Sequence, residues 1–245
     1  MPDKNGQGGI VVQTCTNITI DSCYISNVPT GIRASQSQGI VVTHCQAKNM
    51  TGPYPGGQFV QFVFLSGGGN RIAFNKFENI LGESDPEDAI NINNSNGLPS
   101  DPILIENNWI RGGGPSSSGG GIILGDVGGS YQIARNNFLV DPGQYGMAVA
   151  SGNSMAIVNN TIYAKSQSFT NEGIYYQNFY PSIASYNVTI SKNAVNYTNS
   201  NGQLKDLYLA PNTTTPTGWN KNVHDATLSE SLLPQNIVSS SIFGQ

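Results

Sequence analysis

The sequence AIVNNTI occupies residues 156–162, and close variants of it occur upstream as IARNNF at 133–138 and as LIENNWI at 104–110. Two more distant versions are ITIDSCYI at 18–25 and VTISKN at 188–193. Aligned on the turn that follows the β-branched pair, these segments and their neighbours predict one column of turn residues, with intervals of 22, 31, 32, 29, 23 and 33 residues: Cys23, Cys45, Lys76, Asn108, Asn137, Asn160 and Asn193. A period of this length indicates a solenoid of stacked repeats.

A second column stays in phase with the first. It is a small or turn residue followed by an apolar-x-apolar triplet, in GIVV, GIRA, FVQF, AINI, GIIL, GMAV, GIYY and DLYL, which begin at Gly9, Gly31, Phe59, Ala89, Gly121, Gly146, Gly173 and Asp206. Short strands that cannot bury their apolar faces alone must stack on their neighbours, at about 4.8 Å per coil. The predicted fold class is all-β: a right-handed parallel β-helix of eight coils.

The two columns resemble the parallel β-helix repeats of the pectate-lyase-like superfamily over residues 9–210. This resemblance implies a carbohydrate-active lyase, epimerase or hydrolase that holds a polysaccharide along one face. It also implies acidic residues that ligate Ca²⁺ or act as acid and base, and an Arg or Lys that abstracts a proton. The run EDAINI at 87–92 is similar to the DDAI-type segment of polygalacturonase-like hydrolases, whose Asn-Thr-Asp, Gly-His-Gly and Arg-x-Lys motifs are absent from this sequence.

The composition of the chain limits which classes of binding partner are expected. Only 11% of the residues are charged, and the 11 scattered Lys and Arg residues within a net charge of −4 form no basic stripe, so we expect no nucleic-acid partner. No window approaches the roughly 18 apolar residues of a membrane span. The start, Met1-Pro2-Asp3-Lys4, lacks a signal-peptide pattern, which indicates a cytoplasmic protein or a leader already removed. With the resemblance, we expect an extracellular or cell-surface location.

The repeat fades beyond about Pro211. We therefore predict a β-helix over residues 1–210 and a C-terminal cap or tail over 211–245 that packs on the solenoid. Thr227 and Glu230 form a potential capping box, which suits a small helix or coil covering the open end. Only eight residues precede the first repeat strand at Gly9, so we expect either a larger parent chain or a homo-oligomer that protects this end.

Extra residues collect at one corner. The spacing from the turn column to the apolar triplet is 8, 14, 13, 13, 9, 13 and 13 residues, so the insertions lie just before that strand and would wall a groove. The residue between the two apolar positions points outward, giving a predicted strip along the stack. Its members are Val11, Arg33, Gln61, Asn91, Ile123, Ala148, Tyr175 and Tyr208, of which Arg33, Gln61, Asn91, Tyr175 and Tyr208 are the candidates for binding substrate.

The largest concentration of acidic residues precedes the predicted strand at 89–92. Glu83, Asp85, Glu87 and Asp88 place four carboxylates in six positions of a chain that has 15. Asp85, Glu87 and Asp88 could ligate Ca²⁺, which prefers oxygen ligands, or two of them could serve as acid and base. A solvated acidic loop is the third interpretation.

Two further residue sets are candidates for special roles. Arg111 and Arg33 could bind a substrate carboxylate or act as a lyase base, although either could equally be a surface arginine that satisfies carbonyl groups. Cys23 and Cys45 share the turn column in successive coils, which permits a disulfide or two stacked thiols.

Two functions stay open at this point. The corner loops and the acidic cluster favour a polysaccharide lyase, epimerase or hydrolase, with Asp85, Glu87, Asp88 and Arg111 as its catalytic candidates. The incomplete catalytic set favours a non-catalytic glycan-binding, adhesive or structural module of a larger assembly, because fold does not determine function.

Overall fold

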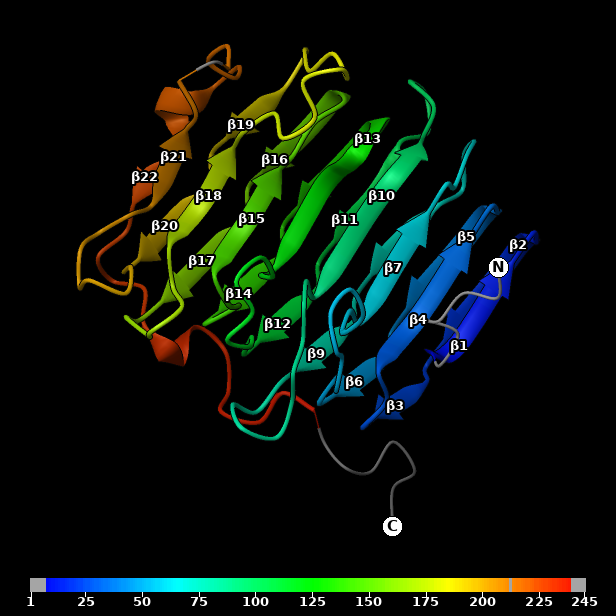
Figure 1. Cartoon of the computed structure of the whole chain (residues 1–245), viewed down its shortest axis with the longest axis horizontal. Coiled ribbons are helices and arrows are strands. Elements are labelled where there is room, and N and C mark those ends of the chain that lie inside the picture. Colours follow the sequence, from blue (N-terminus) through cyan, green and yellow to red (C-terminus); the bar gives the residue numbers. More distant parts are fainter. Residues whose placement is uncertain (1–7, 212, 239–245) are drawn as a thin grey trace.

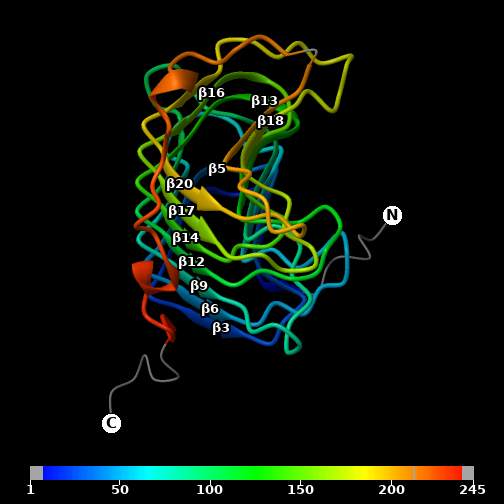
Figure 2. The same cartoon turned by 90° about the vertical axis from the view of Figure 1, so that its left-hand side faces the viewer.

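The computed structural model describes residues 8–211 and 213–238, which form a stack of coils with three strand-bearing faces (Figures 1 and 2). All paired strands of these residues run parallel, each bonded to the corresponding strands of the neighbouring coils. The predicted parallel β-helix is therefore confirmed.

The first face carries the apolar triplets of the second sequence column. Its strands are β1 (Gly8–Gln13), β4 (Thr30–Ser35), β7 (Val60–Val63), β10 (Ile90–Asn96), the first half of β13 (Ile122–Arg135), β15 (Tyr145–Val149), β18 (Glu172–Tyr176) and β21 (Leu207–Leu209). The second face carries β2 (Thr16–Asp21), β5 (Gln38–Thr43), β8 (Arg71–Ala73), β11 (Ile103–Glu106), the second half of β13, β16 (Asn153–Val158) and β19 (Thr189–Ser191). Because β13 continues from one face to the other, these two faces form one bent sheet.

The third face is a separate sheet that follows the asparagine turns. It consists of β3 (Tyr24–Ser26), β6 (Gln46–Lys48), β9 (Lys76–Glu78), β12 (Trp109–Arg111), β14 (Phe138–Val140), β17 (Thr161–Ala164), β20 (Ala194–Tyr197) and β22 (Val223–His224). The two helices of the described residues are single 3₁₀ turns, η1 (Trp219–Lys221) and η2 (Glu230–Leu232). In the described part of the chain no helix is long and apolar enough to cross a membrane.

The interior is filled by columns of aliphatic side chains. Along the first face Ile32, Val60, Ile90 and Ile122 follow one another in register, and all four are completely buried. Burying one such side chain stabilises the fold by about 1.5–3 kcal/mol. No single coil can bury its own column, so the stability belongs to the stack.

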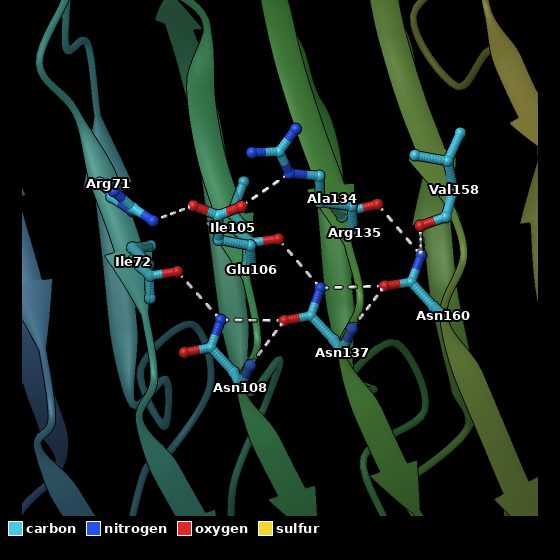
Figure 3. A network of polar contacts seen from close by, with 10 residues as sticks. All are labelled: Arg71, Ile72, Ile105, Glu106, Asn108, Ala134, Arg135, Asn137, Val158 and Asn160. Carbon is cyan, nitrogen blue, oxygen red and sulfur yellow. Dashed lines mark hydrogen bonds and ion pairs between the residues drawn. The ribbon is translucent and has the colours of Figure 1, made fainter.

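Buried asparagines tie the coils together at the turn between the second and third faces (Figure 3). Asn137 is typical: its Nδ2 donates to Asn160 Oδ1 at 3.0 Å and to the Ile105 carbonyl at 2.9 Å, while its Oδ1 accepts from Asn108. The ladder continues through every coil from the third onward, and its members are Asn75, Asn108, Asn137, Asn160, Asn193 and Asn222. Each amide therefore satisfies backbone groups that the turn would otherwise leave unpaired.

The structure corrects one member of the predicted turn column. Lys76 pairs with Trp109 on the third face, one position beyond the turn, and Asn75 holds the ladder position instead. The prediction was wrong because an asparagine and a lysine adjoin at this point, and only the register of β9 decides which one occupies the turn.

The cysteines of the first two coils precede the asparagines in the same column. Cys23 and Cys45 lie directly before the paired residues Tyr24 and Gln46, and both are free thiols, which agrees with stacked thiols and not with a disulfide. Burial raises the pKa of the Cys45 thiol to about 11, so this thiol is a structural group and not a nucleophile.

The predicted collection of insertions at one corner is confirmed. Most connections from the third face back to the first are long, at 49–59, 79–89, 112–121, 165–171 and 198–206, whereas those at 27–29 and 141–144 are short. A second insertion, at 177–188 between β18 and β19, lies on the other side of the first face. This second insertion was not predicted.

The C-terminal segment packs on the last coil of the solenoid and then along its side. Residues 217–225 continue the stack, because Thr217 bridges Thr189 and β22 pairs with β20. The chain then crosses the outside of the third face (Figure 2). There the buried Glu78 accepts hydrogen bonds from the backbone N–H groups of Ile237 and Val238. The described residues beyond 211 therefore pack on the solenoid, and the boundary at 210 stays a prediction. Thr227 and Glu230 form no capping box, because the N-cap residue of η2 is Ser229.

We expect Asn137→Ala to destabilise the protein by about 2–4 kcal/mol, because it leaves several buried backbone and amide groups unpaired. Asn201→Ala is the matched control, since Asn201 is exposed and should change stability by less than about 0.5 kcal/mol. Urea denaturation measures both. Equal stability of the two variants would show that the ladder contributes nothing.

Candidate active site

A cleft of about 610 Å³ lies over the first face. The corner loops form one wall through residues of 54–58, 87–88 and 117–118, and the insertion at 177–188 forms the other through Phe179 and Tyr180. Its lining is Tyr54, Pro55, Gln58, Gln61, Glu87, Asp88, Asn91, Asn93, Ser117, Ser118, Ile123, Asp126, Val127, Gln144, Ala150, Tyr175, Phe179 and Tyr180.

The predicted outward strip is one continuous ladder. Each of its eight residues pairs with the next, from Val11 to Tyr208. Gln61, Asn91 and Tyr175 line the cleft. Arg33 lies one coil outside it and donates to Gln61 at 3.3 Å, whereas Tyr208, 39% exposed, lies beyond Tyr175.

Part of this strip is covered, which the alternation of the strand did not predict. Ile123, Ala148 and Tyr175 are buried in a small apolar cluster outside the solenoid, together with Tyr145 and Ala150. The insertion at 177–188 covers it, with Phe179 edge-on to Tyr175 at 5.8 Å. The first face therefore presents a walled site and not an open strip.

Asp88 is the centre of the hydrogen-bond network in the cleft. Only 4% of its surface is exposed, and its Oδ1 accepts from the buried Tyr145 hydroxyl and from the Gly120 N–H. Burial raises the pKa of the Asp88 carboxyl to about 7, and the hydrogen bonds from Tyr145 and Asn91 oppose this rise. The acidic neighbours Glu87 and Asp126 raise this pKa further.

A second carboxylate is held beside it by the same amide. Asn91 Nδ2 donates to Asp88 Oδ2 at 2.9 Å and to Asp126 Oδ2 at 3.1 Å, so these two oxygens are no farther apart than the sum of those distances, 6.0 Å. Asp126 also accepts from Asn93 at 2.9 Å and from Tyr180 at 2.8 Å. Asn91 thus acts as a spacer between two carboxylates.

Asp126 was not among the residues predicted from the sequence. It follows the triplet GIIL and Gly125, and its register partner is Asn93 in the preceding coil. Its wall partner Tyr180 was missed as well. One signal existed: Gly173 and Asn193 are twenty positions apart, against fourteen between Gly146 and Asn160, which marks the insertion that carries Tyr180.

The other acidic candidates are placed differently. Glu87 lines the cleft and accepts from the hydroxyls of Ser116 and Ser118, whereas Asp85 is exposed and is not part of the lining. Residues 8–211 and 213–238 contain no group of three or more His, Cys, Asp or Glu side chains that could hold a metal ion. The Ca²⁺ site of Asp85, Glu87 and Asp88 stays a prediction.

Arg111 is not brought to the cleft. It lies on β12 of the third face, where its guanidinium donates to the carbonyls of Glu230 and Leu233 in the C-terminal segment. It lines a separate cavity of about 350 Å³ together with Asp141 and Lys165. The structure therefore does not support its grouping with Asp88, because the two residues lie on different faces.

Two amide oxygens on the cleft residues lack hydrogen-bond partners. Gln58 Oε1 and Asn91 Oδ1 are buried and accept no hydrogen bond within the described structure, and their side chains are 1% and 4% exposed. An unpaired buried acceptor costs about 1–3 kcal/mol. Such groups in a cleft are candidates for contact with a bound molecule.

Comparison with known proteins identifies the repeat. A family model described as "Right handed beta helix region" matches residues 3–162, a range that includes Asp88, Asn91 and Asp126 but ends before Tyr175 and Tyr180. No curated protein and no solved structure matches the chain.

Asp88 should make stability depend on pH. Its folded-state pKa of about 7 exceeds the roughly 3.9 of an unfolded aspartate. The stabilising effect of the bound proton is therefore complete below pH 4 and is lost as the pH rises towards 7. Over this range the free energy of unfolding should fall by about 4 kcal/mol.

We expect Asp88→Asn to remove this downward slope in the free energy of unfolding between pH 4 and 7. The matched control Asp85→Asn, at an exposed carboxyl, should keep it. Urea melts at several pH values measure the slope separately from any constant offset. An unchanged slope in Asp88→Asn would contradict the assignment.

Proposed function

Because this chain belongs to the right-handed β-helix family, we propose that the cleft over its first face binds a polysaccharide and hydrolyses a glycosidic bond. The observation that carries the proposal is the carboxyl pair Asp88 and Asp126, joined through Asn91 Nδ2. Glycosidases need one carboxyl group that is protonated near neutral pH and a second carboxylate close to it.

The two carboxyl groups have distinct roles in this proposal. Asp88, with a pKa raised to about 7 by burial, is the general acid that protonates the leaving oxygen. Asp126 is the partner carboxylate. Their nearest oxygens lie within 6.0 Å, which accommodates the carboxyl separation of roughly 5–5.5 Å in retaining enzymes, and we propose this retaining arrangement. Asp126 would then be the nucleophile.

The lining favours hydrolysis over uronate lyase or epimerase chemistry. Among the described residues that line the cleft there is no Lys, Arg or His, so the cleft offers neither a basic proton acceptor of that type nor a cation to neutralise a uronate carboxylate. Aromatic side chains and amides line the remaining wall, a combination that suits sugar rings and their hydroxyl groups.

A second candidate, glycan binding without turnover, is favoured by one observation. Both oxygens of Asp88 already accept hydrogen bonds, from Tyr145, Gly120 and Asn91. An acid that is fully engaged in this way must exchange a hydrogen bond before it reaches a glycosidic oxygen.

We expect the protein to release reducing ends from at least one polysaccharide in a panel of neutral, amino and uronate polymers. Asp88→Asn and Asp126→Asn should each lower kcat by about 10²–10⁴-fold. In the parent protein, NMR of the products should show that the anomeric configuration is retained. Glu172→Gln is the matched control, because Glu172 lies on the first face outside the cleft lining.

Three other results would contradict hydrolysis or the role of Asp126. Glycan binding without any reducing ends would support the non-catalytic candidate and contradict hydrolysis. Products that absorb as unsaturated uronates would indicate a lyase. Inversion of the anomeric centre would contradict the role of Asp126 as nucleophile.

A further inference from the structure

In the described part of the chain, the carboxyl groups that line the cleft have no basic side chain among them. Glu87 and Asp126 line the cleft beside Asp88, the proposed general acid, and the described lining contains no cationic side chain. Buried or partly buried carboxylates act through a medium that screens them less than water does. The nearest basic side chain on the strip, Arg33, lies one coil away.

The hydrogen-bonding capacity of the cleft is biased in the same direction. Gln58 Oε1 and Asn91 Oδ1 are unpartnered acceptors on side chains that are more than nine-tenths buried. The Asn91 amide cannot turn to relieve this, because its Nδ2 already serves two carboxylates. Because less than 1 Å² of each oxygen is exposed, a bound molecule pairs them only when the Gln58 and Asn91 side chains shift. A molecule that brings hydrogen-bond donors gains from this shift, whereas one that brings further acceptors does not.

Aromatic rings complete the pattern. Tyr54 and Phe179 are 73% and 49% exposed, and they line the cleft together with Tyr175 and Tyr180. The face of an aromatic ring attracts cations. Carboxylates, unpaired acceptors and ring faces therefore all favour a ligand that is positively charged and rich in donors.

We propose that the cleft selects an amino-sugar polymer, whose units carry a free ammonium group, over neutral sugars and over uronates. This inference rests on the proposed glycan-binding function and adds the substrate class. It predicts attraction between the ammonium groups and the region around Glu87 and Asp126, and repulsion of any carboxylate-bearing sugar.

Four matched hexamers with the same β-1,4 linkage test this selectivity. They are hexamers of glucosamine, glucose, N-acetylglucosamine and glucuronic acid, with affinity measured by isothermal titration calorimetry on the Asp126→Asn protein and on the parent at 4 °C. We expect the parent to bind the glucosamine hexamer about tenfold more tightly than the glucose hexamer at low salt, and this advantage to shrink at high salt. The glucuronic acid hexamer should bind most weakly. Asp126→Asn should keep part of the preference, because Glu87 remains.

One variant tests the charge without removing a contact. Ser117 is exposed, lines the cleft and offers only its backbone carbonyl to Gln144, so Ser117→Lys adds a cation there while keeping the loop bonds. It should abolish the preference for the glucosamine hexamer, because the added cation repels the ammonium groups. A steric effect of the longer side chain would weaken both hexamers alike, so the ratio of the two affinities reports the charge. Leu98→Lys, at an exposed turn outside the cleft lining, adds the same charge and should change neither affinity.

The failures are distinguishable. Equal binding of the glucosamine and glucose hexamers, or stronger binding of the glucuronic acid hexamer, would overturn the selectivity and leave the glycan site standing. Binding of none of the four would overturn both the selectivity and the proposed glycan function.

Discussion

The hydrogen bonds between successive coils are the interaction on which the rest of this structure depends. Every strand is bonded to the corresponding strands of its neighbours in parallel, so the spacing of about 4.8 Å applies to every column of side chains. The asparagine ladder extends this bonding through the turn between the second and third faces. A coil can therefore gain many residues only where its chain leaves the ladder.

This constraint explains where the cleft forms. Long insertions lie in the connections between strands, whereas β13 carries only local register shifts against β10, between Asn91 and Asn93 and between Asn93 and Ser95. The corner loops and the insertion at 177–188 leave the ladder on opposite sides of the first face, and both extend over it. A strand face that would otherwise meet solvent becomes the floor of a walled cleft lined by polar and aromatic side chains.

The floor of the cleft differs chemically from the rest of the solenoid. Elsewhere a buried carboxylate meets a cation: Glu106, for example, lies between Arg71 and Arg135 (Figure 3). Asp88 instead meets a phenol, a backbone N–H and an amide, and its burial raises its pKa to about 7. The many inter-coil bonds of the stack offset the local cost of this arrangement. Local departures of this kind are expected at functional sites.

The sequence by itself determined the fold, the order of the coils, the outward strip and the corner that holds the insertions, because period, strand alternation and turn residues are local properties that repeat. It also placed Asp88, Glu87 and Asn91 next to that corner. Only the tertiary structure decided that Asp126 and Asp88 share one amide, that Arg111 belongs to the C-terminal contact, and that Tyr145 and Tyr180 join the site. These relations depend on which coil stacks on which and on how a loop folds over a face, and a side chain that is 35 residues away in sequence becomes a neighbour only through that stacking.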